Sequence, residues 1–334
     1  MKILTDILTE GLCKCHSSNL KKYTMHDVTF CTSNDMYKYD YDTFDMIYTH
    51  VTADDKMLTT KAKIIYSLHV FHISCPYGGF YCLVLNKFLE DPLTCLNCLG
   101  YLGIKTGETR LKKYIRLAKR ADIITVDSNF MKEFYHAYDP VYLPVPMETD
   151  VLTPCSDKEN YILYTGRLSF EKNPYGFVDI INKTGLKGKM IIYNFLPNDS
   201  TTNSKRYYKE ILENTNKNIE IFINPSKEEM IELVKHAKFT VLPYLFAEPF
   251  GIASLNSVLC GTPLVAFPYG NSRNMTHLLP KTLDEIIQLV KMDDKQYQLT
   301  IKETLKKSDE LRDMHDPVKA VKKWDKLCEN LMLR

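Results

Sequence analysis

Residues 161–185 read YILYTGRLSFEKNPYGFVDIINKTG and decide the fold of the chain. The run 161–165 is apolar and rich in aromatic and β-branched residues, which predicts a buried strand. Gly166 lets the backbone turn tightly where that strand ends. The following stretch, 172–185, predicts a helix that Gly185 closes. A strand, a turn and a helix in this order form the repeating unit of a parallel α/β sheet.

The same alternation continues through both halves of the chain. Further strands are expected at 1–8, 26–32, 44–51, 62–70, 121–128, 189–195, 219–224, 238–244 and 263–268. Helices are expected at 110–120, 204–217, 226–237, 251–260, 284–313 and 317–333, and residues 11–23 form either a helix or an irregular loop. Ser226 and Glu229 have the spacing of a capping box at the start of one of these helices.

The length of 334 residues predicts two domains, which we place at 1–152 and 153–334. The stretch 143–154 contains three prolines and cannot form regular structure, as is typical of an interdomain linker. We therefore expect two Rossmann-like domains with a cleft between them. In such sheets ligands bind outside the carboxyl ends of the strands.

Composition and charge exclude several classes of protein. Lys and Arg total 43 and Asp and Glu total 41, so the formal net charge is +2. This balance excludes a polybasic nucleic-acid coat or an acidic disordered tail as the whole protein. No run approaches the ~20 apolar residues of a membrane-spanning helix. The first residues, MKILTDILTEG, lack the features of a signal peptide, so we expect a cytoplasmic protein.

Three ordered motifs in the second half carry the chemistry. GRLSFEKN, at 166–173, follows a strand and puts Arg167 and Lys172 where a diphosphate could be neutralised. EPFGIA, at 248–253, sets a carboxylate and a glycine turn before a helix, whose N-terminus favours anions. CGTPLV, at 260–265, ends that helix and starts a buried strand. Solvated loop cations and a helix-capping glutamate are the alternative interpretations of the first two motifs.

Together these motifs resemble the donor-binding domain of family-four retaining glycosyltransferases, which have the GT-B fold. The family patterns G-R-L-x-x-x-K-N and E-P-F-G…G-T-P-V are matched by GRLSFEKN and EPFGIASLNSVLCGTPLV, and the resemblance extends over nearly the whole chain. It implies two Rossmann-like domains facing across a cleft. It also implies a last helix, about 317–334 and including Trp324, that crosses back onto the first domain.

The resemblance implies a nucleotide-diphosphate-sugar donor and a role for each matched residue. Arg167 and Lys172 would bind the diphosphate and stabilise its charge, without a metal cofactor for catalysis. Glu248 would accept hydrogen bonds from the donor sugar. Further donor-binding residues would be Gly166, Phe250, Gly251, Ile252 and Asn256. Asn256 stands where the family has a second glutamate that grips the ribose, so nucleotide affinity is expected to be lower.

In the first half, SLHVFHISCPYGGFY resembles a family subgroup that reads H-D-x-x-x-x-C-P-x-G-G. By this resemblance His69 would reach the donor sugar near its reacting carbon, and His72 would be a bystander. Val70 replaces the aspartate of the pattern, and a hydrogen-bonded histidine at a strand end is the alternative for His69. The expected reaction is a front-side displacement with retention, in which the departing phosphate oxygen takes the proton of the acceptor hydroxyl.

Four cysteines lie within a short stretch: Cys75, Cys82, Cys95 and Cys98. Four thiolates, two of them in a C-x-x-C, suffice for a tetrahedral structural zinc site, and similar sets occur in the subgroup. Disulfides and free thiols are the alternatives.

The acceptor is a glycan, a lipid-linked molecule or a protein, and the sequence does not distinguish these. The basic stretch from Arg110 to Arg120 predicts either a solvated helix face, with Leu111, Ile115 and Ala118 inward, or a docking surface. Its partner would be an anionic membrane, contacted peripherally, or a polyanionic acceptor. No motif for reading nucleic acid is present. The main rival function is a non-catalytic protein that binds a nucleotide sugar or glycan on a degenerate GT-B fold. A dinucleotide oxidoreductase is disfavoured because no G-x-G-x-x-G follows a predicted strand.

Overall fold

The computed structural model describes residues 1–7, 11–74, 81–82, 87–88, 105–193 and 204–334. The chain divides into two compact units. Unit 1 comprises Met1–Glu148 and Met314–Arg334, and unit 2 comprises Thr149–Asp313. The first crossing between units lies within 143–154, a stretch without helix or strand, in agreement with its prolines.

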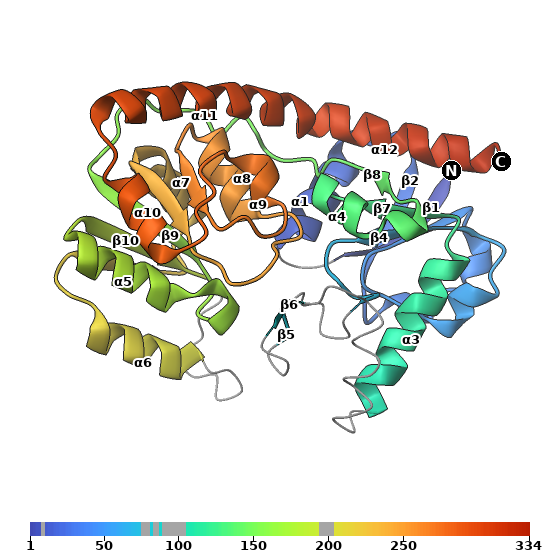
Figure 1. Ribbon diagram of the computed structural model, residues 1–334. Helices are drawn as coiled ribbons and strands as arrows, with labels where there is room; N and C mark the ends of the chain where they lie inside the picture. Colours follow the sequence, from blue (N-terminus) through green and yellow to red (C-terminus); the bar gives the residue numbers. More distant parts are fainter. Residues whose placement is uncertain (8–10, 75–80, 83–86, 89–104, 194–203) are drawn as a thin grey trace. The chain divides into compact units, whose positions relative to one another are not determined.

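Unit 1 is built on a six-stranded parallel sheet (Figure 1). In spatial order its strands are β2 (Asp27–Thr32), β1 (Lys2–Ile7), β3 (Met46–Thr49), β4 (Lys63–Leu68), β7 (Ile123–Val126) and β8 (Val141–Tyr142). All four residues of β3 are buried, as expected of a central strand covered on both faces. A short antiparallel pair, β5 (Tyr81–Cys82) and β6 (Lys87–Phe88), is separate from this sheet.

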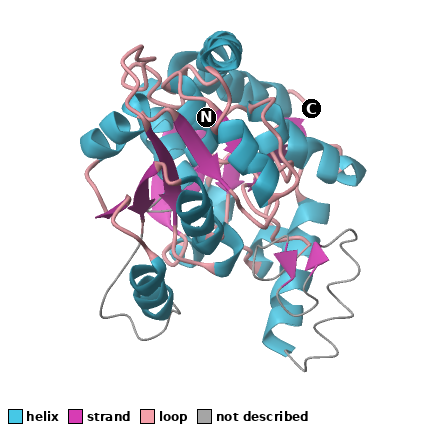
Figure 2. Cartoon of the chain, turned by 60° about the vertical axis from the view of Figure 1, so that its left-hand side comes forward, coloured by secondary structure: helices cyan, strands magenta, loops and turns pink. Residues whose placement is uncertain are grey.

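Unit 2 is built on a five-stranded parallel sheet, and Figure 2 shows helices packed around strands. The spatial order is β11 (Ile219–Ile223), β10 (Lys187–Ile192), β9 (Tyr161–Gly166), β12 (Phe239–Leu242) and β13 (Leu264–Ala266). All six residues of β9 are buried, which confirms the prediction of a buried strand that ends at Gly166. The α/β class predicted from the alternation is confirmed in both units.

The helices follow the predicted pattern with shifted ends. Unit 1 contains α1 (Gly11–Tyr23), α3 (Lys105–Arg120), α4 (Asn129–Phe134) and α12 (Pro317–Met332). Unit 2 contains α5 (Pro174–Thr184), α6 (Ser204–Asn214), α7 (Lys227–His236), α8 (Ile252–Leu259), α9 (Ser272–Met275) and α10 (Leu283–Val290), and α11 (Asp294–Met314) ends at the boundary. The capping prediction holds in part, because the Glu229 N–H donates to Ser226 Oγ at 3.1 Å. No helix among the described residues is long and apolar enough to cross a membrane.

The expectation of one continuous helix over 284–313 was wrong. The chain leaves helical structure between α10 and α11, where Asp293 Oδ1 accepts a hydrogen bond from the Gln296 N–H at 2.8 Å. An aspartate in this position starts a new helix by satisfying one of its free N–H groups. Asp316 does the same for α12, with Pro317 at the first helical position.

Helix α12 packs into the core of unit 1. Trp324 is 1 % exposed and lies 5.4 Å, ring centre to ring centre, from Tyr48 of β3. The buried apolar cluster around it consists of Ile3, Leu20, Met46, Tyr48, Ile65, Leu143, Val321, Trp324, Cys328 and Leu331. The two ends of the chain therefore share one core, and Figure 1 shows the N- and C-termini close together.

Candidate active site

The first motif of unit 2 begins where β9 ends. A Cβ atom on Gly166 would lie 2.9 Å from the hydroxyl oxygen of Tyr164 and 3.1 Å from that of Tyr244, so a larger residue has no room there. The 3-10 turn Phe170–Lys172 follows directly. The Tyr164 hydroxyl donates to the Lys172 carbonyl at 3.2 Å, which ties this turn to the strand.

Lys172 and Glu248, from the first and second motifs, form an ion pair. Lys172 Nζ lies 2.6 Å from Glu248 Oε2, and Lys172 is only 9 % exposed. The ammonium group also lies over two aromatic rings, 4.0 Å from the centre of Tyr244 and 4.6 Å from that of Phe246. Burial lowers the pKa of Lys172, and the Glu248 carboxylate opposes that shift. The site thus holds a desolvated cation with an adjacent acceptor, an arrangement suited to a charged ligand.

Arg167 is more exposed than Lys172 and has a different partner. Its Nη2 lies 3.3 Å from Glu171 Oε1, and Ser169 Oγ donates to the same oxygen at 2.7 Å. The guanidinium side chain is 58 % exposed, so it can turn toward an anion at little cost. Sequence reasoning did not assign a role to Glu171, although its i,i+4 spacing from Arg167 was visible.

Glu248 is held through its backbone by the segment after β13. The Asn271 N–H donates to the Glu248 carbonyl at 2.8 Å, and Asn271 Nδ2 donates to the Phe250 carbonyl at 2.8 Å. Gly270 pairs with Glu248 as an isolated bridge and has φ +63°. A Cβ atom there would lie 2.3 Å from both the nitrogen and the oxygen of Glu248, so only glycine fits.

The N-terminus of α8 lies two residues beyond Phe250. Its N-cap is Gly251, with φ +89° and no side-chain cap, which leaves the first N–H groups, including that of Ile252, without a side-chain acceptor from the cap. Free N–H groups and the helix dipole make such an end suitable for an anion. The ring of Phe250 is buried at 1 % exposure, so its side chain is part of the core.

Asn256 lies further along α8 with its amide half-buried. Its Nδ2 is 3.9 Å from the Met230 sulfur, and its Oδ1 has no hydrogen-bond partner within the described part of the chain. This oxygen is buried, and a buried amide oxygen without a partner is uncommon in folded proteins.

The carboxyl edge of the unit 1 sheet carries a second polar group, centred on His69. His69 Nδ1 lies 3.0 Å from Asp127 Oδ2, and His69 Nε2 lies 2.5 Å from His50 Nδ1. All three side chains are buried. His72 is not part of this group: its ring stacks on Tyr114 at 4.7 Å. Sequence reasoning selected His69 but missed His50 and Asp127, each of which follows a strand end directly.

His50 is placed by a buried carboxylate on β1. Asp6 accepts the N–H groups of His50, Val51 and Thr52 at 2.7, 3.0 and 2.8 Å. These three bonds fix the loop that follows β3 and satisfy the Asp6 carboxylate without a cation. The orientation of His50 is therefore determined by the fold of unit 1.

The predicted zinc ligands cannot be placed. Cys75, Cys95 and Cys98, together with the side chain of Cys82, lie outside the described residues. Among the side chains that are described, no group of three or more His, Cys, Asp and Glu residues is arranged to hold a metal ion.

The basic helix α3 is partly neutralised by acidic neighbours. Arg116 and Lys113 lie 2.9 and 3.8 Å from the Asp55 carboxylate, and Arg120 lies 3.3 Å from that of Asp122. Leu111, Tyr114, Leu117 and Ala118 form its buried face. Ile115, also expected on that face, is partly buried.

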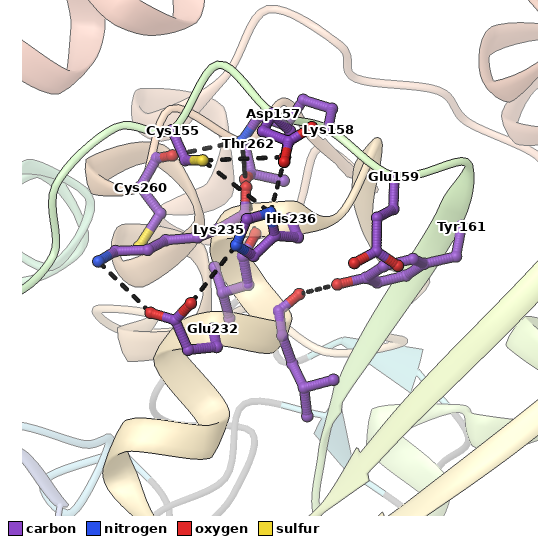
Figure 3. Close-up of polar contacts among 12 residues, drawn as sticks. Cys155, Asp157, Lys158, Glu159, Tyr161, Glu232, Lys235, His236, Cys260 and Thr262 are labelled. Atoms are coloured by element: carbon purple, nitrogen blue, oxygen red, sulfur yellow. Dashed lines mark hydrogen bonds and ion pairs between the residues drawn. The ribbon is translucent and has the colours of Figure 1, made fainter.

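A third polar cluster, shown in Figure 3, is structural. Lys158 Nζ donates to the Lys235 carbonyl at 2.6 Å, to Thr262 Oγ1 at 2.8 Å and to the Cys260 carbonyl at 3.4 Å. These acceptors lie at or just beyond the C-terminal ends of α7 and α8, where a cation is favoured. Burial lowers the pKa of Lys158 to about 8. The cluster fastens the segment before β9 to two helix ends.

Solved structures similar to this chain share one fold. HepE from Anabaena, in complex with UDP and glucose, aligns over 99 % of this chain and 100 % of its own, with a TM-score of 0.70 and 13 % identity. Sucrose-phosphate synthase from Thermosynechococcus elongatus aligns over 87 % of this chain and 74 % of its own, with a TM-score of 0.69 and 13 % identity. A glycosyltransferase from Rickettsia africae aligns over 99 % of this chain and 98 % of its own, with a TM-score of 0.64 and 13 % identity. The fold is therefore GT-B.

The sequence comparison adds the class of protein. Residues 153–314 match the model of the family described as Glycosyl transferases group 1, which spans almost all of unit 2 and slightly less than half of the chain. The match confirms the resemblance to GT-B glycosyltransferases and, with the fold, supports a glycosyltransferase. No curated protein sequence matches the chain.

Proposed function

We propose that the protein is a retaining glycosyltransferase that moves a sugar from a nucleoside diphosphate to an acceptor hydroxyl. The Lys172–Glu248 pair, followed closely by the uncapped N-terminus of α8, carries the proposal. A cation and free helix N–H groups suit a diphosphate, and a carboxylate suits sugar hydroxyls. The HepE structures similar to this chain contain UDP or UDP-glucose, which favours a uridine nucleotide sugar as the donor.

In the proposed complex, the diphosphate lies against Arg167, Lys172 and the N–H groups of Gly251 and Ile252. These groups stabilise the charge that develops on the leaving phosphate. Because Lys172 is buried, its interaction with that charge is stronger than in water. The oxygen of Glu248 that does not contact Lys172 accepts a hydrogen bond from the donor sugar, and Asn256 bonds the ribose.

The proposed chemistry is a front-side displacement that retains the configuration at the transferred carbon. The bond from that carbon to the phosphate oxygen breaks, the bond to the acceptor oxygen forms, and the departing phosphate oxygen takes the acceptor proton. No side chain is assigned as a nucleophile. The histidine group of unit 1, to which His69 belongs, is proposed to contact substrate hydroxyls through one of its rings. Arg167, Lys172 and the α8 dipole take the charge-neutralising role, so activity should survive EDTA.

The proposal extends to the class of acceptor and to the place of the reaction. A glycan, a lipid-linked molecule or a protein can supply the acceptor hydroxyl, and we propose that the reaction takes place in the cytoplasm. Peripheral contact with an anionic membrane would use the basic stretch of α3, in which Lys112 and Lys119 are exposed. Flotation with anionic vesicles tests that contact.

A non-catalytic nucleotide-sugar-binding protein is the second candidate. Asn256, in the place of a carboxylate, favours it, because an amide binds ribose hydroxyls less strongly than a charged acceptor does. Binding without turnover of any donor would support this candidate.

Thermal unfolding with UDP, GDP, ADP, dTDP and their sugars tests the donor site. A ligand at a hundred times its dissociation constant stabilises by about 2.7 kcal/mol, which raises Tm by on the order of 5 to 10 °C. We expect one base to give this shift and Arg167→Ala to reduce it. Arg206→Ala is the matched control, because Arg206 also forms an i,i+4 pair, 2.7 Å from Glu210. No shift with any nucleotide, or equal shifts in both variants, would contradict the proposed donor site.

A further inference from the structure

Four neighbouring strands of the unit 1 sheet carry polar residues at their carboxyl ends. In the spatial order β1, β3, β4 and β7, these residues are Asp6, His50, His69 and Asp127. Each contacts the next: Asp6 accepts the His50 backbone N–H, His50 contacts His69 ring to ring, and His69 contacts Asp127. These four residues, which we call the row, therefore form one continuous hydrogen-bonded group. It lies along the edge where α/β sheets bind ligands.

The bonding within the row determines which nitrogen carries which proton. Burial raises the pKa of Asp127, and the contact with His69 opposes that shift. As a carboxylate Asp127 accepts, so His69 Nδ1 carries the proton of that bond. In a neutral His69 ring Nε2 then has only a lone pair, so it accepts a hydrogen bond from the N–H of His50 Nδ1 across the 2.5 Å contact. His50 in turn keeps its lone pair on Nε2. Both ring nitrogens of His69 are engaged, whereas no hydrogen bond between described residues uses His50 Nε2.

The surroundings of His50 keep its ring neutral. Burial lowers the pKa of His50, and the neighbouring His69 lowers it further. The groups that face it from the packed elements are His16 on α1, Asp6 on β1, Tyr48 on β3 and His69 on β4, with Asp127 on β7 beyond His69. At neutral pH the open nitrogen is thus a hydrogen-bond acceptor, and a hydroxyl group is the donor that suits it.

We infer that His50, not His69, is the histidine whose ring nitrogen binds a hydroxyl of the carbohydrate substrate, and that His69 and Asp127 set its tautomer. This inference rests on the proposed transfer reaction for the identity of the ligand. The row itself rests only on the geometry of unit 1. His50 is then a substrate-binding residue, and His69 is a positioning residue that acts through it.

Two substitutions at position 50 separate contact with substrate from support of His69. In His50→Asn the amide nitrogen lies near the place of Nδ1, so the bond to His69 is kept and the open nitrogen is lost. In His50→Gln the amide lies near the place of Nε2, so a polar group faces the substrate and the bond to His69 is lost. We expect kcat/KM to fall on the order of 10- to 100-fold in the Asn variant and less in the Gln variant.

The control is His72→Gln, which alters a nearby histidine outside the row and should leave kcat/KM unchanged. Unchanged Tm in each variant shows that the fold is intact. A His50→Asn enzyme with wild-type kcat/KM, or a Gln variant weaker than the Asn variant, would overturn the inference, because that order is expected when His50 only supports His69.

A measurement that needs no substrate separates this inference from the proposed function. In protein labelled with ¹⁵N-histidine, the short bond between His50 and His69 should give a far-downfield proton resonance that His50→Phe and His69→Phe both remove and His72→Gln retains. Absence of this resonance from the wild-type protein would overturn the tautomer assignment. If the resonance is present and no nucleotide sugar is turned over, the proposed function is wrong, and so is the carbohydrate ligand inferred for His50. The hydrogen bonding within the row is then still supported.

Discussion

Gly270 is the residue on which the position of Glu248 depends most directly. Replacement by alanine places a methyl group 2.3 Å from the Glu248 backbone at a positive φ. We expect Gly270→Ala to lower the free energy of unfolding by about 2 to 4 kcal/mol and to weaken donor binding, because the Glu248 backbone must move. Denaturant unfolding and nucleotide titration measure the two effects.

Gly185→Ala is the matched control for this prediction. Gly185 has a similar φ of +69°, but nothing lies within 4 Å of a Cβ atom there. It should therefore show only the backbone strain of a left-handed alanine, about 1 to 2 kcal/mol, with donor binding unchanged. Equal effects of the two substitutions on donor binding would show that Gly270 does not position Glu248.

At the scale of single residues, the sequence indicated the candidate site residues but not the contacts between them. Lys172 and Glu248 were both assigned to the donor, yet their mutual ion pair was not predicted, because it depends on the return of the chain after β12. Tyr244 and Phe246 were missed for the same reason. A lysine enclosed by aromatic rings looks in sequence like any loop lysine followed much later by aromatic residues.

At the scale of elements, Lys158 joins three parts of unit 2. It is the donor for two carbonyls and one hydroxyl at the ends of α7 and α8. We expect Lys158→Met to lower the free energy of unfolding by about 1 to 3 kcal/mol, because these acceptors lose their donor. The activity at temperatures well below Tm should not change.

Chemical denaturation of the Lys158→Met variant, followed by a transfer assay at low temperature, checks both parts. Lys183→Met is the control, since Lys183 is half-exposed and forms its ion pair with Asp179 on its own helix, at 2.9 Å. A loss of activity without a loss of stability would mean that the cluster in Figure 3 serves the reaction rather than the fold.

The elements themselves were largely predictable, because strand and helix periods and glycine positions act locally. The break between α10 and α11 was missed, since the capping role of Asp293 depends on a single side-chain bond within an otherwise helical pattern. The row at the unit 1 sheet edge was only partly found. Polar residues directly after strands, such as His50 and Asp127, were a visible signal, but strand order brings them together, and the sequence alone did not supply that order.

At the scale of the whole molecule, stability should depend on the protonation of buried histidines. Burial lowers the pKa of His315 to about 4, whereas an unfolded histidine titrates near 6.5. Between these values the unfolded chain binds more protons, so stability is full above pH ~6.5 and falls as the pH drops toward 4. The loss from this one group is about 1.4 kcal/mol per pH unit within that window.

His315→Asn isolates this contribution. The asparagine amide can still donate to the Val145 carbonyl, to which His315 Nδ1 donates at 2.8 Å, but it does not titrate. Urea unfolding of both proteins from pH 7 to pH 4 should show a smaller loss for the variant. Parallel curves would mean that His315 does not titrate differently in the folded and unfolded states.

Donor turnover by Lys172→Met tests most directly whether the cation at position 172 holds a leaving diphosphate. Nucleoside diphosphate released from a panel of nucleotide sugars, with water or an acceptor extract as acceptor, is measured for wild type, Lys172→Met and the control Lys183→Met. We expect turnover of one donor, with a rate that is about 100-fold or more lower in Lys172→Met and unchanged in the control. Equal turnover in all three proteins would contradict it.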